Sequence, residues 1–196
     1  MGNSTTAPAS VRCRSDDPKG STVFADSLSS RVFENLAASS PAQTLDCFGG
    51  YIEILSKHSD FWVLRGTVPP GSAVPAHHHP DPEDFLILSG RQQVLVSDGD
   101  AMAWREARAG DYLRVPGGAL HAHRNVTDEP AVDLIVTTER LGTFFEEIGR
   151  PVTDDLQPPT PQEVAHFVAK SIEYGYVLAT PEENAAYGIE LSGFTL

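Results

Sequence analysis

Between residues 42 and 138 the apolar positions form short runs of β-branched and aromatic residues, and turn residues separate one run from the next. Clear separators are Val68-Pro69-Pro70-Gly71 and Ser97-Asp98-Gly99-Asp100. No helical period lies between the runs, which argues against a parallel α/β sheet and for an antiparallel sandwich or closed barrel. The pattern predicts strands over Tyr51–Leu55, Phe61–Val68, Phe85–Leu88, Gln93–Val96, Tyr112–Val115, Ala119–Arg124 and Ala131–Thr137.

After residue 138 the apolar spacing becomes helical. The apolar residues of 141–148 fall on one helical face, and Gly149 ends that helix. Thr160-Pro161-Gln162-Glu163 predicts the start of a second helix, because the threonine caps it, the proline suits its first turn and the glutamate completes a capping box. Gly175 ends it. Its buried face is expected to consist of Val164, Phe167, Val168, Ser171 and Ile172.

Residues 1–28 are rich in Ser, Thr, Asp, Pro and Gly without apolar periodicity, which predicts a flexible tail. We expect residues 1–20 to be dispensable for folding. A short helix over 31–38 is compatible with the sequence, and Pro41 would end it. The start Met1-Gly2-Asn3-Ser4-Thr5-Thr6 fits the loose N-myristoylation pattern without a nearby basic cluster, so the modification stays open. The expected regions are the tail 1–28, a barrel domain 29–138 and a helical extension 139–196 that covers the barrel mouth or forms a subunit contact.

The chain of 196 residues carries 14 basic and 27 acidic side chains, a formal net charge of −13. Such a surface repels phosphate backbones and anionic lipid, so we expect neither nucleic acid nor a membrane as a partner. No apolar run approaches the roughly 20 residues of a membrane helix. Nothing at the N-terminus resembles a secretory signal, and Cys13 and Cys47 are too few for a disulfide framework. We therefore expect free thiols and a cytoplasmic protein.

Two segments concentrate residues that bind metals. In an extended chain His77 and His79 point to the same side while His78 points to the other, and a turn through Pro80-Asp81-Pro82 can bring Glu83 to join them. Taken alone, a run of three histidines beside acidic residues also fits a surface tract that binds metal adventitiously.

The second segment places His121, His123 and Asn125 on one face of a strand. Three imidazoles and a carboxylate suit Fe(II), Mn(II), Ni(II), Cu(II) or Zn(II), with one or two positions left for substrate or dioxygen. The sequence alone does not choose among these metals.

The spacing within the two segments resembles the paired signature motifs of the cupin superfamily. The first segment reads G-x5-H-x-H-x3-E-x6-G from Gly71 to Gly90, and the second reads G-x5-P-x-G-x2-H-x3-N from Gly110 to Asn125. The resemblance implies an all-β fold, a small antiparallel jelly-roll-like barrel over about 42–138, followed here by the helical C-terminal extension.

The resemblance also implies a set of ligands. One divalent transition metal per chain, with Fe(II) favoured, would be held by His77, His79, Glu83 and His121. Asn125 would give hydrogen-bonding support rather than ligation. Some members of the superfamily have one more residue before the acidic ligand, which would select Asp84, but the six residues before Gly90 favour Glu83.

The chain after residue 138 is similar to the C-terminal extension of single-domain cupins of the quercetin-dioxygenase-like group. Cupin barrels are commonly paired, and Phe144 and Phe145 lie outside the barrel pattern. We therefore expect a homodimer.

Three classes of function are compatible with a metal-binding cupin barrel. The first is a metal-dependent dioxygenase acting on a small planar aromatic or enolic metabolite that binds the metal, and this is the class we expect. The second is a non-redox isomerase, cyclase, dehydratase or decarboxylase in which the metal is a Lewis acid. The third is a non-catalytic module that binds a small molecule.

Five further side chains are candidates for contact with a substrate. His123, two residues after His121 on the same strand face, is the candidate general acid or base, although it can equally be a packing residue. Phe85 and Ile87 would form an apolar wall beneath the metal. Arg65 and Arg114 would present a cation to an anionic substrate if their strands turn them inward.

Overall fold

The computed structural model describes residues 35–36, 44–99 and 101–190. The expected flexible tail, the myristoylation pattern, Cys13 and most of the helix expected over 31–38 lie outside the described residues. Within them, no helix is both long enough and apolar enough to cross a membrane.

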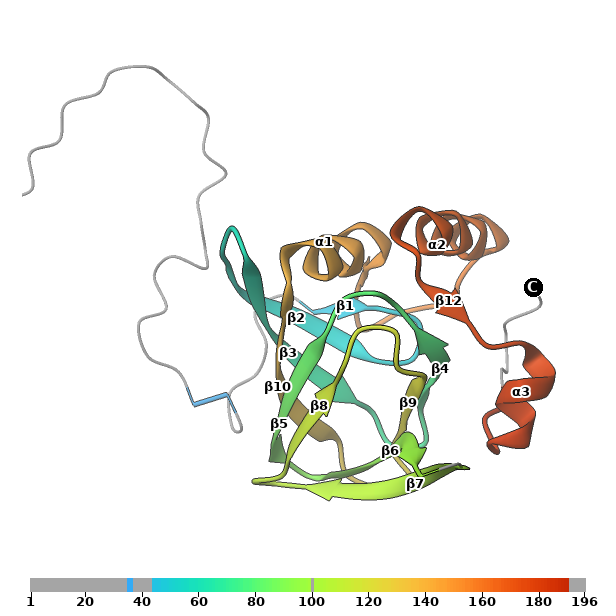
Figure 1. The fold of residues 1–196 in the computed structure, drawn as a ribbon. Coiled ribbons are helices and arrows are strands. Elements are labelled where there is room, and N and C mark those ends of the chain that lie inside the picture. Colours follow the sequence, from blue (N-terminus) through green and yellow to red (C-terminus); the bar gives the residue numbers. More distant parts are fainter. Residues whose placement is uncertain (1–34, 37–43, 100, 191–196) are drawn as a thin grey trace, which may run out of the picture.

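Two antiparallel sheets face each other and close into a barrel (Figure 1). The larger sheet has the strand order β11-β1-β2-β3-β10-β5-β8 and the smaller one β12-β4-β9-β6-β7. The larger sheet consists of β1 (Leu45–Asp46), β2 (Tyr51–Lys57), β3 (Phe61–Val68), β5 (Glu83–Ser89), β8 (Tyr112–Val115), β10 (Ala131–Thr138) and β11 (Arg150–Pro151). The smaller sheet consists of β4 (Ala73–His78), β6 (Arg91–Asp98), β7 (Ala101–Arg108), β9 (His121–Arg124) and β12 (Val177–Leu178). The expected all-β, jelly-roll-like fold is confirmed.

The expected strands recur with small changes at their ends, but β4, β7 and the two-residue strands β1, β11 and β12 were not predicted. Strand β7 reads Ala101-Met-Ala-Trp-Arg-Glu-Ala-Arg108, and alanine, glutamate and arginine do not favour strands. It is a strand because it pairs with β6 over the whole length of both, from Arg91 opposite Arg108 to Asp98 opposite Ala101. Pairing with a neighbour thus overrides local propensity here.

Three helices follow the barrel among the described residues: α1 (Glu139–Ile148), α2 (Pro161–Tyr174) and α3 (Pro181–Ala186). The capping box predicted for α2 is present, and Gly175 ends the helix with φ 63°. The short α3 was not predicted, although Thr180 and Glu183 repeat the same capping box. The expected place of Ile172 in the buried face of α2 is wrong, because its side chain is 76% exposed.

The helices α1 and α2 lie over one end of the barrel (Figure 1). Their buried side chains form an apolar cluster with the chain before β2 and after α2, composed of Phe48, Leu141, Phe144, Ile148, Phe167 and Tyr176. Phe144 is fully buried, and Phe145 packs against the barrel core. The two phenylalanines on which we based the expected dimer are therefore occupied within their own chain.

Gly142 is the point of closest approach between α1 and the barrel. A Cβ atom added there would lie 2.4 Å from the ring of Trp62. We expect Gly142→Ala to lower the free energy of unfolding by up to about 2 kcal/mol, because overpacking costs about 1–3 kcal/mol and helix propensity returns only roughly 1 kcal/mol. Denaturant unfolding measures this, with Thr143→Ala on the same helix as the control. A more stable Gly142→Ala variant would show that the helix shifts freely over Trp62.

Candidate metal centre

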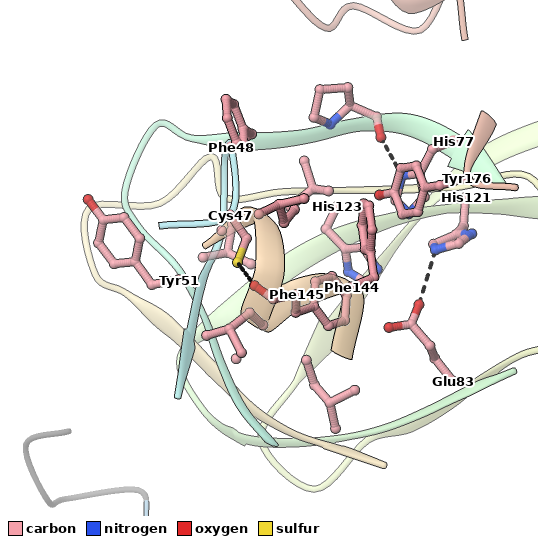
Figure 2. A pocket seen from close by; sticks show the side chains of 18 of the residues that line it. Cys47, Phe48, Tyr51, His77, Glu83, His121, His123, Phe144, Phe145 and Tyr176 are labelled. Atoms are coloured by element: carbon pink, nitrogen blue, oxygen red, sulfur yellow. Dashed lines mark hydrogen bonds and ion pairs between the residues drawn. The ribbon is translucent and has the colours of Figure 1, made fainter. Parts of the chain in front are cut away.

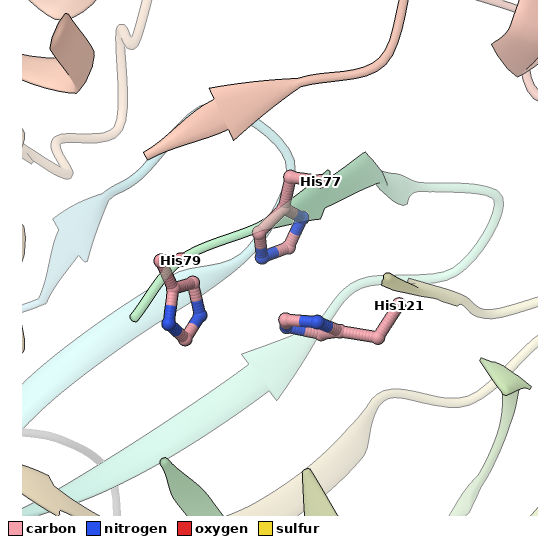
Figure 3. Close-up of side chains that lie close together, drawn as sticks. All are labelled: His77, His79 and His121. Carbon is pink, nitrogen blue, oxygen red and sulfur yellow. The ribbon is translucent and has the colours of Figure 1, made fainter. Parts of the chain in front are cut away.

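Three histidines meet inside the barrel, at the end that α1 and α2 cover. His77 belongs to β4, His79 to the turn that follows, and His121 opens β9. His77 lies opposite His121 in the register of these two strands. One ring nitrogen from each lies within 4.8 Å of the others, and all three residues are buried (Figure 3).

The same backbone arrangement fixes each of the three rings. Nδ1 of His77 forms a hydrogen bond of 2.7 Å with the carbonyl oxygen of Pro75. Nδ1 of His79 does the same with the carbonyl of Asp81 at 2.8 Å. Nδ1 of His121 lies 2.9 Å from the carbonyl oxygen of Ala119. A carbonyl only accepts, so each Nδ1 carries the proton and each Nε2 keeps its lone pair for a metal. The buried Nε2 of His121 has no hydrogen-bond partner among the described residues, so its lone pair is available to a cation.

Glu83, the first residue of β5, lies beside two of the three histidines. One of its carboxylate oxygens, Oε2, lies 3.1 Å from Nε2 of His79 and 3.4 Å from Nε2 of His121. Two atoms that bind one ion in neighbouring positions at about 2.1 Å lie about 3.0–3.4 Å apart, so these distances match shared ligation.

The protonation states around this group also suit a cation. Burial raises the pKa of Glu83, but the neighbouring imidazoles of His121 and His79 outweigh burial and hold that pKa well below its usual range. Burial and the neighbouring His121 and His79 lower the pKa of His77 well below its usual range. Ionised carboxylate and neutral imidazole are the forms that bind divalent metals.

Neighbouring residues that alternate with these ligands point elsewhere. Asp84 is half-buried and accepts a hydrogen bond of 2.6 Å from the Tyr112 hydroxyl, on the face of β5 opposite to Glu83. His78 is half-buried and lies beside β12, opposite Val177. The structure thus brings Glu83 rather than Asp84 to His79 and His121.

A cavity of about 70 Å³ adjoins His77, Glu83 and His121 (Figure 2). A water needs roughly 10–15 Å³ on this measure, so the space suits a small molecule or a few waters. Its walls are mainly apolar and come from both the barrel and the helical extension: Phe48, Ile52, Phe85, Ile135, Phe144 and Phe167. No lysine or arginine is among the described residues that line it.

Tyr176 closes the cavity from the extension. Its ring stacks on that of His77, with centroids 4.4 Å apart and planes at 10°. This stacking follows from the pairing of β12 with β4, which sets Leu178 opposite His77. Sequence reasoning missed Tyr176, because nothing in the local pattern ties it to β4.

Two buried polar side chains that are not candidate ligands also face the cavity. Asp133 and His123 both line it, and Gln92 joins them: its Nε2 donates to Oδ2 of Asp133 at 2.8 Å, and its Oε1 lies 3.2 Å from Nδ1 of His123. Burial, with smaller contributions from His121, lowers the pKa of His123 to about 3. Burial raises the pKa of Asp133 to about 7, and the bond from Gln92 opposes this rise. Sequence reasoning found His123 but missed Asp133, whose signal is an acidic residue in the apolar run Ala131–Val136.

The other expected substrate contacts divide into two groups. Phe85 lines the cavity, whereas Ile87 is buried one layer deeper, with Val94 and Ala107. The expectation that arginines turn inward is wrong. Arg65 alternates with the cavity-lining Gly66, so it faces the other side of β3 and pairs there with Glu53 at 2.6 Å, and Arg114 is exposed.

Asn125 lies away from the cavity. Its amide donates to the carbonyls of Val68 and Glu129, and its oxygen accepts from Thr127. Its hydrogen bonds therefore hold the loop after β9 rather than a metal ligand.

Part of the chain matches a known protein family. Residues 64–137 match the family model described as Cupin domain. Gentisate 1,2-dioxygenase from a Streptomyces species is 32% identical over 90 residues, which are 43% of this chain and 24% of that relative. The chain thus spans about a quarter of the length of the curated relative that it matches.

Solved structures with similar folds have low overall similarity to this chain. An uncharacterised protein with a double-stranded β-helix domain from Klebsiella pneumoniae is 20% identical, with 56% of this chain and 90% of that one covered and a TM-score of 0.43. A Cupin 2 conserved barrel domain protein from Salinispora arenicola is 26% identical, with 47% and 79% covered and a TM-score of 0.41.

Because the pKa of Asp133 is raised, removing its charge should increase the free energy of unfolding by an amount that depends on pH. The usual pKa of 3.8 rises to about 7 on folding. Below pH 3.8 the carboxyl is neutral in the folded and the unfolded chain and costs no stability. Between pH 3.8 and about 7 the unfolded chain ionises while the folded chain stays protonated, so the free energy of unfolding falls as the pH rises. We expect Asp133→Asn to gain stability over the wild type by up to about 1.4 kcal/mol per pH unit in that window, and to level off above it. Denaturant unfolding between pH 5 and 8.5 measures the difference.

Asp84→Asn, on the outer face of the barrel, controls for the amide substitution itself. The same dependence on pH in both variants, or none in Asp133→Asn, would contradict the assignment of this penalty to burial of Asp133.

Proposed function

The chain carries a cupin domain, and from this premise we propose that it is a metal-dependent dioxygenase acting on a small planar aromatic or enolic metabolite. The observation that supports this most is the convergence of three histidines, each with its Nδ1 bound to a backbone carbonyl, beside an apolar cavity. Such a site offers metal ligation and a dry space for a flat molecule in one place.

His77, His79, His121 and Glu83 would hold the metal. This donor set of imidazole and carboxylate suits Fe(II), Mn(II), Ni(II), Cu(II) or Zn(II), and we favour Fe(II) because the proposed reaction uses dioxygen. When bound, iron would supply redox chemistry with dioxygen and the binding of an ionised substrate oxygen.

The residues around the cavity perform three tasks. The aromatic side chains Phe85, Phe144 and Tyr176 exclude water and hold a flat substrate between them. His123 turns its Nδ1 to Gln92, so its Nε2 is the nitrogen left to accept a hydrogen bond or a proton from the substrate. Glu83 contributes one negative charge beside the imidazoles.

The relative named gentisate 1,2-dioxygenase supports the dioxygenase class. In such a reaction both atoms of dioxygen enter the product and the substrate supplies the electrons, so no further reductant is needed. Because the match covers about a quarter of that relative, the substrate of this chain is proposed only as a class, and the homodimer and the cytoplasmic location stay predictions from the sequence.

A second candidate is a non-redox isomerase, cyclase, dehydratase or decarboxylase. The observation that favours it is the presence of two ionisable side chains, His123 and Asp133, in the cavity beside the ligands. Two such groups can move a proton between neighbouring atoms of a substrate while a metal of any redox character polarises it.

We expect His121→Ala to reduce bound metal from about one ion per chain to a small fraction of that, because the variant removes one of the fixed Nε2 donors. His78→Ala, in the adjoining strand but turned away from the site, should keep the wild-type content. Elemental analysis of both proteins after dialysis measures the difference, and circular dichroism verifies that both are folded. Equal metal in the two variants would contradict the proposed ligands.

We expect the iron-loaded protein to consume dioxygen with at least one compound from a panel of hydroxylated aromatic acids, diphenols and β-diketones that includes gentisate. The zinc-loaded protein should consume none. His123→Gln should retain the metal and lower kcat by roughly 100-fold, as expected on losing a general base. An oxygen electrode and product mass spectrometry follow the reaction.

The outcomes of this assay separate the classes of function. Conversion of a substrate without oxygen consumption, by zinc-loaded and iron-loaded protein alike, would replace the dioxygenase by the second candidate. Binding of a compound without conversion by any metal form would indicate a binding module.

A further inference from the structure

The cavity holds a second polar anchor besides the candidate metal ligands, and this is Asp133. We propose that Asp133 accepts a hydrogen bond from a hydroxyl group of the ligand, so that the cavity selects small, mostly apolar molecules that carry a neutral hydroxyl in addition to the group at the metal. The inference rests on the proposed function only in assigning the ligand to this cavity.

Asp133 belongs to β10 and points to the same side as Ala131 and Ile135, into the barrel. It is 2% exposed and lines the cavity. Its Oδ2 accepts the bond from Gln92, whereas its buried Oδ1 lies against the backbone of Gly66, whose N–H lowers the pKa of the carboxyl, and it accepts no hydrogen bond from a side chain of the described residues. A carboxylate oxygen has two lone pairs, so Oδ1 can also accept a hydrogen bond from a ligand in the cavity.

The opposite strand leaves room for this oxygen. Gly66 lies across from Asp133 in the register of β3 and β10, and it also lines the cavity. A Cβ atom on Gly66 would lie 2.1 Å from Oδ1 of Asp133. Any other residue would therefore displace the carboxylate, and a glycine inside a strand commonly marks such a close approach.

Gln92 holds Asp133 and His123 in one arrangement. Because its Nε2 donates to the carboxylate, its Oε1 must face His123, so Nδ1 of that ring is the donor. Oδ1 of Asp133 and Nε2 of His123 are then both acceptors. Gln92 itself is 1% exposed, so water does not compete for these bonds.

The lack of cations selects the kind of ligand group. No lysine or arginine is among the described residues that line the cavity, so a carboxylate or phosphate would find no partner there apart from a metal. A hydroxyl group, in contrast, satisfies an acceptor. Burial also raises the pKa of the Asp133 carboxyl, which is expected of an acid without a cation beside it.

A binding experiment on redox-inactive protein tests this inference. Zinc-loaded wild type is titrated calorimetrically, without oxygen, with catechol, resorcinol, hydroquinone and the monomethyl ether of each. The ether keeps one hydroxyl for the metal and removes the second donor. Asp133→Leu removes the acceptor and keeps the branched shape and the number of side-chain heavy atoms, Asp133→Asn keeps a weaker acceptor, and Asp84→Asn on the outer face is the matched control.

At pH 8.5, where the Asp133 carboxyl is ionised, we expect the wild type to bind at least one diol roughly 10-fold to 100-fold more tightly than its ether, as for a hydrogen bond to a charged group. Asp84→Asn should keep this preference, Asp133→Asn should weaken it and Asp133→Leu should abolish it, with metal content unchanged in all. A wild type without any preference for diols, or an Asp133→Leu variant that keeps it, would overturn the inference.

The same experiment is independent of the proposed reaction. If the zinc-loaded protein shows the Asp133-dependent preference while the iron-loaded protein consumes no dioxygen, the dioxygenase is rejected and the hydroxyl site stands. If oxygen is consumed but the preference is absent, the hydroxyl site is rejected and the dioxygenase stands.

Discussion

Three hydrogen bonds from imidazole to backbone determine what the centre of this barrel can bind. The carbonyls of Pro75, Asp81 and Ala119 each hold a ring by its Nδ1, and these carbonyls are themselves positioned by β4, the following turn and the approach to β9. Because the backbone makes the bonds, the ligand geometry depends on strand register rather than on flexible side chains. A slip of one residue between β4 and β9 would turn His77 and His121 to opposite sides of the barrel wall.

The site is completed by chain that lies beyond the matched cupin domain. Residues 64–137 supply all four candidate ligands, whereas Phe144, Phe167 and Tyr176 close the cavity from the extension. An ion pair between Arg140 and Asp81 joins the extension to the turn that carries His79, and Arg140 also donates to the carbonyl of Tyr174. The barrel thus supplies the candidate metal ligands, and the extension limits the size and the polarity of a molecule that can bind in the cavity.

The candidate ligands could be predicted from the sequence because they follow rules of short range. Strand alternation puts His77 and His79 on one side, and a tight turn returns Glu83 to them. The cavity walls could not be predicted, because they depend on which strands and helices meet across long separations, as when β12 reaches β4 or Asp133 meets Gln92. The inward turn expected of Arg65 and Arg114 failed for the same reason: the phase of a strand depends on its neighbours.

The charges around the cavity suggest why Arg65 and Arg114 are not needed. A divalent ion held by three neutral imidazoles and the ionised Glu83 would keep one net positive charge, since the carboxylate neutralises only half of the ion. One ionised oxygen of a substrate balances that charge, and a second anionic group would remain uncompensated in an apolar, arginine-free space. The electrostatics therefore favour a ligand with a single acidic hydroxyl or enol at the metal and neutral donors elsewhere, which is the same class of molecule that the acceptors Asp133 and His123 favour.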